Sequence, residues 1–239
     1  GYSTQQHFTY GERNNTRIYC GIIADNTYLY LGTDNGILVY NYRTDKYEQP
    51  ETDFPTDVRT MALQGDTLWI GSLNGLYTYQ LNTKKLASLD SKSNGLPHHT
   101  IYSIIRTTDN QIYVGTYNGL CRYIEESGKF ENIPLPVNRS VSNLFVNSLL
   151  EDTSRQCIWI GMEGSLFQYT PATGLMKPID AFHNNSIKSL ALDGDGNLLA
   201  GTDNGLYVYQ NDNGTLQHIV HDSRNIQSVS YTHLTLPTT

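Results

Sequence analysis

Basic residues are scarce in this sequence, and long apolar segments are absent from it. Lys and Arg number 16 against 23 Asp and Glu, which gives a formal net charge of −7. Because no basic stretch stands out, nucleic acid is not expected as a partner. No apolar run reaches about 18 residues, so direct membrane insertion is not expected. Residues 1–15 are polar and lack a signal-peptide pattern, as in a secreted protein whose leader has been removed or in a fragment of a longer chain.

Cysteine is equally sparse, and motifs that mark enzymes are missing. The three cysteines, Cys20, Cys121 and Cys157, form no C-x-x-C pair, which argues against a disulfide framework or a zinc site. We expect buried free thiols. No H-E-x-x-H, G-x-S-x-G, Walker A or EF-hand pattern occurs. Residues 193–197 superficially resemble a calcium loop, but Asn204 stands where the pattern requires Glu. No catalytic residue, metal or cofactor is therefore expected in this segment.

A repeated motif dominates the sequence instead. Five segments carry G-x-x-N-G or a close variant, an apolar residue, and a tyrosine four positions after the second glycine. They are residues 32–40, 71–79, 115–123, 161–169 and 201–209. In the fourth copy the second glycine comes one place early. The first glycines, at positions 32, 71, 115, 161 and 201, are separated by 39, 44, 46 and 40 residues, a period that fits the blades of a β-propeller.

Each repeat predicts four short antiparallel strands, A to D. Strand B, as in residues 68–71, is apolar on consecutive positions, so both of its faces should be buried between neighbouring blades. Helical solenoids lack support because no segment has a 3.6-residue period. The predicted fold is an all-β propeller of four-stranded antiparallel blades over residues 1–230. The five recognisable blades are approximately residues 17–54, 55–97, 98–143, 144–184 and 185–222.

The two ends of the chain predict a larger ring. Residues 7–10 resemble a last strand without its blade, and residues 225–229 resemble the start of a sixth repeat. We therefore expect an arc truncated from a ring of six or seven blades. The tail, residues 231–239, matches no repeat and is interpreted as a non-native extension.

The motif residues have mechanical interpretations. Asn-Gly tolerates positive φ at both positions, which predicts a tight primed turn between strands B and C. The first glycine should leave room for a close neighbour, for which we expect an aromatic ring of an adjacent strand. The repeat tyrosines should fill the space between blades. They are Tyr40, Tyr79, Tyr123, Tyr169 and Tyr209.

On these residues, the repeat resembles that of the two-component regulator propeller family. Residues 68–79, 112–123, 158–169 and 198–209 carry the form Leu-Trp-Ile-Gly-Thr-x-x-Gly-Leu-x-x-Tyr, and residues 94–97 and 141–143 resemble the connector before strand A. The resemblance implies the periplasmic sensor region of Bacteroides-type hybrid two-component systems. There, two propellers and a small β-sandwich precede a membrane helix, a histidine kinase and a DNA-binding output. Such sensors commonly recognise oligosaccharides, and the sandwich, helix and kinase lie outside the present chain.

A ligand would bind where the loops of all blades converge at the mouth of the central channel. By the usual propeller geometry, the D–A and B–C loops share that face. Tyr117 could stack on a sugar ring, and Arg59 could pair with an acidic sugar. The candidate ligand-binding residues are Arg17, Arg59, His98, His99, Tyr117, Phe145, Glu163, His183 and Asn184.

Two other functions stay open at this point. One is a protein-interaction propeller that contacts an adjacent propeller, the sandwich domain or a homodimer mate. The other is a fragment of a propeller-fold polysaccharide lyase or glycosidase, whose paired carboxylates could come from different blades. A WD-repeat scaffold is disfavoured, because neither the Gly-His nor the Trp-Asp dipeptide occurs.

Overall fold

The computed structural model describes residues 16–48, 50, 52–89, 94–136, 144–179, 182, 185–210 and 214–219. Every regular element in these ranges is a β-strand, and the strands form five four-stranded antiparallel sheets. In each sheet the strands follow their order in the sequence. The prediction of an all-β propeller with five four-stranded blades is confirmed.

The blades have the following strands, named A to D from the first to the last. Blade 1 consists of β1 (Ile18–Ala24), β2 (Tyr28–Thr33), β3 (Gly36–Asn41) and β4 (Lys46–Glu48). Blade 2 consists of β5 (Val58–Gln64), β6 (Thr67–Ser72), β7 (Gly75–Gln80) and β8 (Lys85–Leu89). Blade 3 consists of β9 (Ile101–Arg106), β10 (Ile112–Thr116), β11 (Gly119–Ile124) and β12 (Lys129–Ile133). Blade 4 consists of β13 (Val146–Asp152), β14 (Cys157–Met162), β15 (Ser165–Thr170) and β16 (Leu175–Pro178). Blade 5 consists of β17 (Ile187–Leu192), β18 (Leu198–Thr202), β19 (Gly205–Tyr209) and β20 (Leu216–Ile219).

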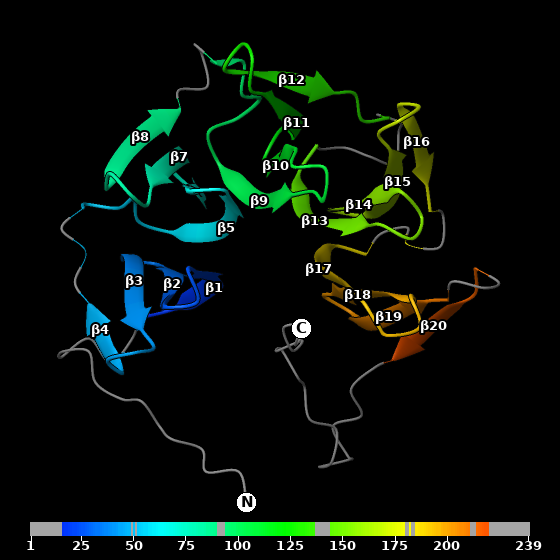
Figure 1. The fold of residues 1–239 in the computed structure, drawn as a ribbon. Helices are drawn as coiled ribbons and strands as arrows, with labels where there is room; N and C mark the ends of the chain where they lie inside the picture. Colours follow the sequence, from blue (N-terminus) through cyan, green and yellow to red (C-terminus); the bar gives the residue numbers. More distant parts are fainter. Residues whose placement is uncertain are drawn as a thin grey trace, which may run out of the picture.

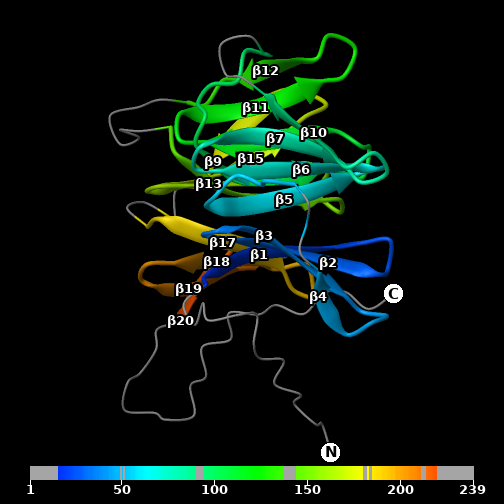
Figure 2. The same ribbon diagram turned by 90° about the vertical axis from the view of Figure 1, so that its left-hand side faces the viewer.

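The blades follow one another around a central axis, from blade 1 at the lower left to blade 5 at the lower right (Figure 1). The A strands β1, β5, β9, β13 and β17 lie on the inner side, and each contacts the next. The D strands lie on the outer side of the arc (Figure 1). Figure 2 shows the arc turned by 90°, with blades 2 to 4 above blades 1 and 5. The number of blades in a complete ring stays a prediction.

In the first four repeats, the first glycine forms a socket, a space without a side chain that a residue of the next blade enters. A Cβ atom on Gly71 would lie 2.5 Å from Cγ2 of Ile101, the residue that opens strand A of blade 3. The four such pairs are Gly32 with Val58, Gly71 with Ile101, Gly115 with Val146, and Gly161 with Ile187. All four inserted side chains are 0% exposed. The expected aromatic neighbour was therefore wrong, because β-branched aliphatic side chains are compact enough to enter the narrow space between two inner strands.

The B–C turns also differ from the prediction. The second glycine has a positive φ in all five blades, 113° at Gly36 for example. The asparagine that precedes it in four of them does not, so those four turns are not of the primed type I′. A hydroxyl explains the difference. Oγ1 of Thr33 donates a hydrogen bond to the Gly36 carbonyl and accepts one from the Asn35 amide. Ser72, Thr116 and Thr202 act in the same way.

Aromatic side chains close the seams between blades. Trp69 of β6 contacts Tyr123 with ring centroids 4.8 Å apart, and Trp159 of β14 contacts Tyr209 at 6.1 Å. Tyr113 and Tyr169 make the same contact at 6.5 Å between blades 3 and 4, and Tyr79 packs against Phe54 at 4.9 Å. These repeat tyrosines fill the seams as predicted. Tyr40 instead packs on Tyr42 and Tyr47 within its own blade.

The three cysteines are free thiols inside or near the core. Cys121 and Cys157 are buried, and Cys20 is half-buried beside Gly32. Burial raises the pKa of all three, that of Cys20 to about 12. The thiols are therefore protonated at neutral pH and serve as small apolar side chains, as expected.

Candidate functional site

One face of the propeller is built from the B–C turns and the residues that precede strand A. In four blades a backbone hydrogen bond joins these two segments, as from the Tyr117 amide to the Thr100 carbonyl at 3.0 Å. We call the eight residues of these bonds the mouth ring. They are Arg17 with Asp34, Asp57 with Leu73, Thr100 with Tyr117, and Phe145 with Glu163. Further bonds, such as the Gly119 amide to the Leu144 carbonyl at 2.9 Å, join neighbouring blades. Hydrogen bonds thus hold the backbone of the mouth ring, while its side chains differ from blade to blade.

A β-bulge shapes the start of every innermost strand. The register of strand A against strand B shifts between its first and third residues in all five blades, so the second residue has no partner. A bulge of this kind redirects a side chain and is frequent beside functional sites. We call the five displaced residues the inner ring. They are Tyr19, Arg59, Tyr102, Asn147 and Lys188.

Aromatic and imidazole rings form a continuous surface over the third blade and its neighbour. His98 stacks on His99 at 4.5 Å and contacts Tyr117 at 5.2 Å. Tyr117 contacts Phe145 at 5.4 Å, and Phe145 contacts Tyr102 at 4.2 Å. Tyr117 is 52% exposed, so one large ring face is open to a ligand. Such a surface can bind the apolar face of a sugar while tyrosine and histidine supply polar atoms.

Arg59 joins this surface from the second blade. Its guanidinium carbon lies 3.8 Å from the ring centroid of Tyr19, which is cation–π geometry. Nη2 lies 3.5 Å from Oδ1 of Asp57. Burial raises the pKa of the Tyr102 hydroxyl, and the nearby Arg59 opposes that shift. The arginine is therefore held between two rings and a carboxylate rather than extended into solvent.

His98 is held in its neutral form. The Thr100 amide donates a 3.0 Å hydrogen bond to Nδ1, which requires an unprotonated nitrogen there. Burial and then the neighbouring His99 lower the pKa of His98. Oγ1 of Thr100 also donates to the Leu73 carbonyl at 3.1 Å. The imidazole thus supports a loop that contacts both the second and the third blade.

The structure brings five of the nominated residues together, namely Arg59, His98, His99, Tyr117 and Phe145. Arg17 and Glu163 are exposed members of the mouth ring, in blades 1 and 4. His183 and Asn184 lie outside the described residues. The sequence interpretation missed Tyr19, Tyr102 and Asn147. Their signal is positional, because each directly follows the residue that opens strand A.

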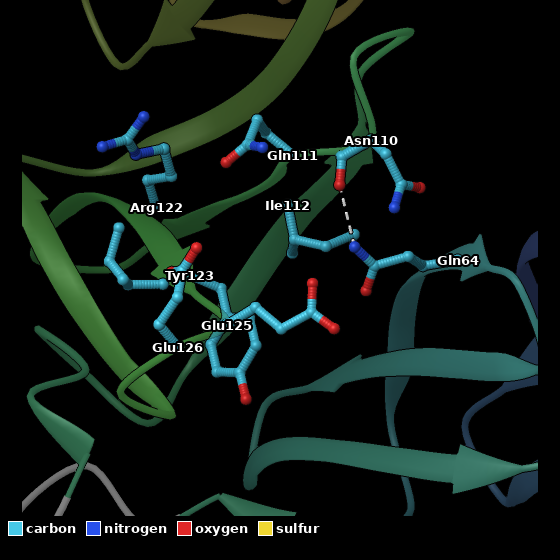
Figure 3. A pocket seen from close by; sticks show the side chains of 9 residues that line it. Gln64, Asn110, Gln111, Ile112, Arg122, Tyr123, Glu125 and Glu126 are labelled. Carbon is cyan, nitrogen blue, oxygen red and sulfur yellow. Dashed lines mark hydrogen bonds between the residues drawn. The ribbon is translucent and has the colours of Figure 1, made fainter.

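Two hollows lie at seams between blades and contain none of the nominated residues. One, of about 250 Å³, separates blades 2 and 3 and is lined by turns on the face opposite the mouth ring. Figure 3 shows it, with the 2.8 Å hydrogen bond from Gln64 Nε2 to the Asn110 carbonyl crossing the seam. The other, of about 500 Å³, lies between blades 1 and 2 and includes Tyr30 and Tyr79.

The remaining features of the described residues concern metal binding and membrane insertion. No group of three or more His, Cys, Asp or Glu side chains in these ranges could hold a metal ion. The carboxylate of Asp193 accepts hydrogen bonds from the Asp195 and Asn197 amides and from Asn197 Nδ2. The calcium-like loop is therefore a self-bonded turn. The part of the chain that the structure describes has no helix long and apolar enough to cross a membrane.

The fold is that of a β-propeller, and aromatic side chains gather on the face formed by its B–C turns and the residues before strand A. The family model of the two component regulator propeller matches residues 95–118. The chain is 80% identical to the extracellular domain of BT4673 from B. thetaiotaomicron, with a TM-score of 0.90 over 96% of this chain and 31% of that one. That protein is named as a one component system in one structure and as a hybrid two component system in another. The residues that the family model matches contain strands A and B of blade 3.

Two more distant proteins are also similar to this chain. Over 156 residues the chain is 28% identical to Histidine kinase P4 of Formosa agariphila, covering 58% of this chain and 11% of the kinase. A streptogramin B lyase structure, at 18% identity and a TM-score of 0.64, shares the fold alone. The chain spans about a third of the solved extracellular domain and about a tenth of the kinase.

Proposed function

We propose that this chain is the ligand-sensing propeller of a periplasmic signal-transduction sensor and that it recognises an oligosaccharide. In the parent protein, ligand binding would regulate transcription through a downstream histidine kinase. The similarity to an extracellular sensor domain and to a histidine kinase supports the signalling role. The ring surface around Tyr117 supports the ligand class.

The observation that carries the proposal is the continuity of that surface. Rings from the D–A connector, the B–C turn and strand A of blades 3 and 4 contact one another without interruption. Sugar rings present apolar C–H faces and polar rims, and tyrosine matches both with its ring and its hydroxyl. Backbone hydrogen bonds hold the loops in place before a ligand arrives, which reduces the ordering cost of binding.

Calorimetric titration of the full chain against plant and host oligosaccharides tests the proposal. Tyr117→Ala should weaken binding of the responding saccharide about tenfold, equivalent to about 1.4 kcal/mol. Tyr42→Ala is the matched control, because Tyr42 is also exposed, at 45%, but lies at the end of β3 away from the mouth ring. The Tyr42→Ala variant should bind the saccharide with the affinity of the unmodified chain. Absence of binding across the panel would contradict the proposal.

Two further measurements on the full chain distinguish the two other functions. Release of reducing ends or unsaturated products from a polysaccharide would favour a lyase or glycosidase. A concentration-dependent change of mass in solution without saccharide binding would favour an interaction surface for a second propeller, a sandwich domain or a dimer mate. Exposed apolar residues of blades 1 and 5, such as Ile18 at 56% and Ile219 at 46%, make that second outcome worth measuring.

A further inference from the structure

The inner ring lies at the start of the innermost strand of each blade. In blades 2 to 5 the first residue of strand A is 0% exposed, because it enters the glycine socket of the preceding blade. The second residue, unpaired at the bulge, is half-buried in Arg59, Tyr102 and Asn147 and exposed in Lys188. These strands are the innermost of each sheet, so the inner ring lies on the side of the arc that faces its axis (Figure 1). The 4.2 Å contact of Tyr102 with Phe145 joins the inner ring to the mouth ring.

Two donors of the inner ring lack acceptors. Nε of Arg59 and Nδ2 of Asn147 are buried and form no hydrogen bond with any described residue. A buried donor without an acceptor is unfavourable, and native proteins rarely retain one without a reason. The two donors come from different blades at the same bulge position. A small rotation of either side chain would bring its donor to an oxygen atom of a ligand. That oxygen would be the missing hydrogen-bond acceptor.

The charges of this region are already balanced. Arg59 lies 3.5 Å from a carboxylate oxygen of Asp57, and Lys188 Nζ lies 3.5 Å from one of Asp203. The mouth ring adds one cation, Arg17, and two further carboxylates, those of Asp34 and Glu163. An acidic sugar would therefore meet compensated cations and further carboxylates. A neutral hydrogen-bond acceptor meets no such repulsion.

We propose that the inner ring is the selective part of the site and that it takes an uncharged saccharide. Hydroxyl or ring oxygens of the sugar accept hydrogen bonds from Arg59 and Asn147, and its apolar face lies against Tyr102. This assignment rests on the proposed function, since it presupposes that a saccharide enters at the mouth ring. It replaces the expectation that Arg59 pairs with an acidic sugar.

The experiment is calorimetry of the full chain with neutral cello-, manno-, xylo- and galacto-oligosaccharides and with glucuronate and galacturonate oligomers of equal length. Asn147→Asp keeps the side-chain size but removes the donor, and Tyr102→Ala removes the ring. Each should weaken binding of the responding neutral saccharide at least tenfold. Arg106→Ala, an exposed position at the far end of the same strand as Tyr102, is the control and should change affinity less than twofold.

The outcomes are separable. Binding of a neutral saccharide that Tyr117→Ala weakens, while Asn147→Asp and Tyr102→Ala leave it within twofold, overturns the inner-ring assignment alone. Equal or tighter binding of the uronate oligomers overturns the preference for an uncharged ligand. No binding of any saccharide overturns both this assignment and the proposed function. Thermal melts identify any variant that fails to fold. If Tyr102→Ala does not fold, Tyr102→Phe, which keeps the ring, takes its place and should fold and bind like the unmodified chain, while Asn147→Asp tests the donor independently.

Discussion

At the scale of single residues, the repeat glycines do more for packing than for turns. In the first four motifs the first glycine is a socket for a β-branched side chain, and in all five the second glycine carries the positive φ of the turn. Sequence could place both glycines but could not identify the socket's occupant, since that residue comes from the next blade. It also could not identify the turn type, because the hydroxyl of Thr33 and its equivalents decides it.

The socket predicts a strong effect of one methyl group. In Gly71→Ala the new Cβ would lie 2.5 Å from Ile101 Cγ2 and 2.6 Å from Thr60 Cγ2, so two blades must move apart. We expect a loss of about 1–3 kcal/mol in the free energy of unfolding, measured by urea denaturation. Gly194→Ala is the control, since nothing lies within 4 Å of its Cβ position, and its change should stay within about 0.5 kcal/mol. Equal stability of the two variants would refute the socket.

Trp159 gives a second prediction at this scale. The side chain is 1% exposed, contacts Tyr209 of the next blade, and donates from Nε1 to the buried Asp152 carboxylate at 3.0 Å. Trp159→Ala should cost about 3–5 kcal/mol in chemical denaturation. Trp69→Ala, at the equivalent position of blade 2, should cost a similar amount. Near-neutral shifts would show that strand B is not buried between blades.

At the scale of elements, the sequence predicted most strands but not their bulges. Consecutive apolar residues indicated strand B, and the Asn-Gly pairs located the end of strand B and the start of strand C. The shift in register between strands A and B depends on pairing in the folded sheet, so the pattern of one strand does not reveal it. For this reason Arg59 was nominated through its loop, while Tyr102 and Asn147 were not. The shared face of the D–A and B–C segments followed from strand order alone.

The connector that carries His98 predicts a dependence on pH. Burial and His99 lower its pKa below the usual value of about 6.5. The folded state therefore favours the neutral imidazole, and the stability it contributes is present above pH 6.5 and is lost as the pH falls below that value. Protonation also removes the acceptor for the Thr100 amide.

Melting temperatures from pH 7.5 to 5 measure this effect. The unmodified chain should lose more stability across this range than His98→Gln, whose side-chain oxygen can accept the same bond without titrating. His99 and Tyr117 face His98 in both proteins, so their contributions are shared to first order. Parallel curves for the two proteins would count against a neutral His98.

At the scale of the whole molecule, the repeat period was sufficient to predict the architecture. A spacing of 39 to 46 residues and one motif per blade indicate how each blade packs on the next, which is why the fold followed from the sequence. The end blades differ from the inner ones. Ile18 opens strand A of blade 1 and is 56% exposed, whereas its four equivalents are 0% exposed. The glycine socket of a preceding blade buries each of those four equivalents.

The central claim is that a saccharide binds at the channel mouth between blades 2 and 4. Amide hydrogen exchange of the full chain, with and without a saturating saccharide identified by calorimetry, tests it most directly. The account predicts slower exchange in the segments that contain Thr100, Tyr117 and Phe145, and no change at the opposite face around Asn110. Protection confined to that opposite face, or none at the three mouth segments, would contradict it.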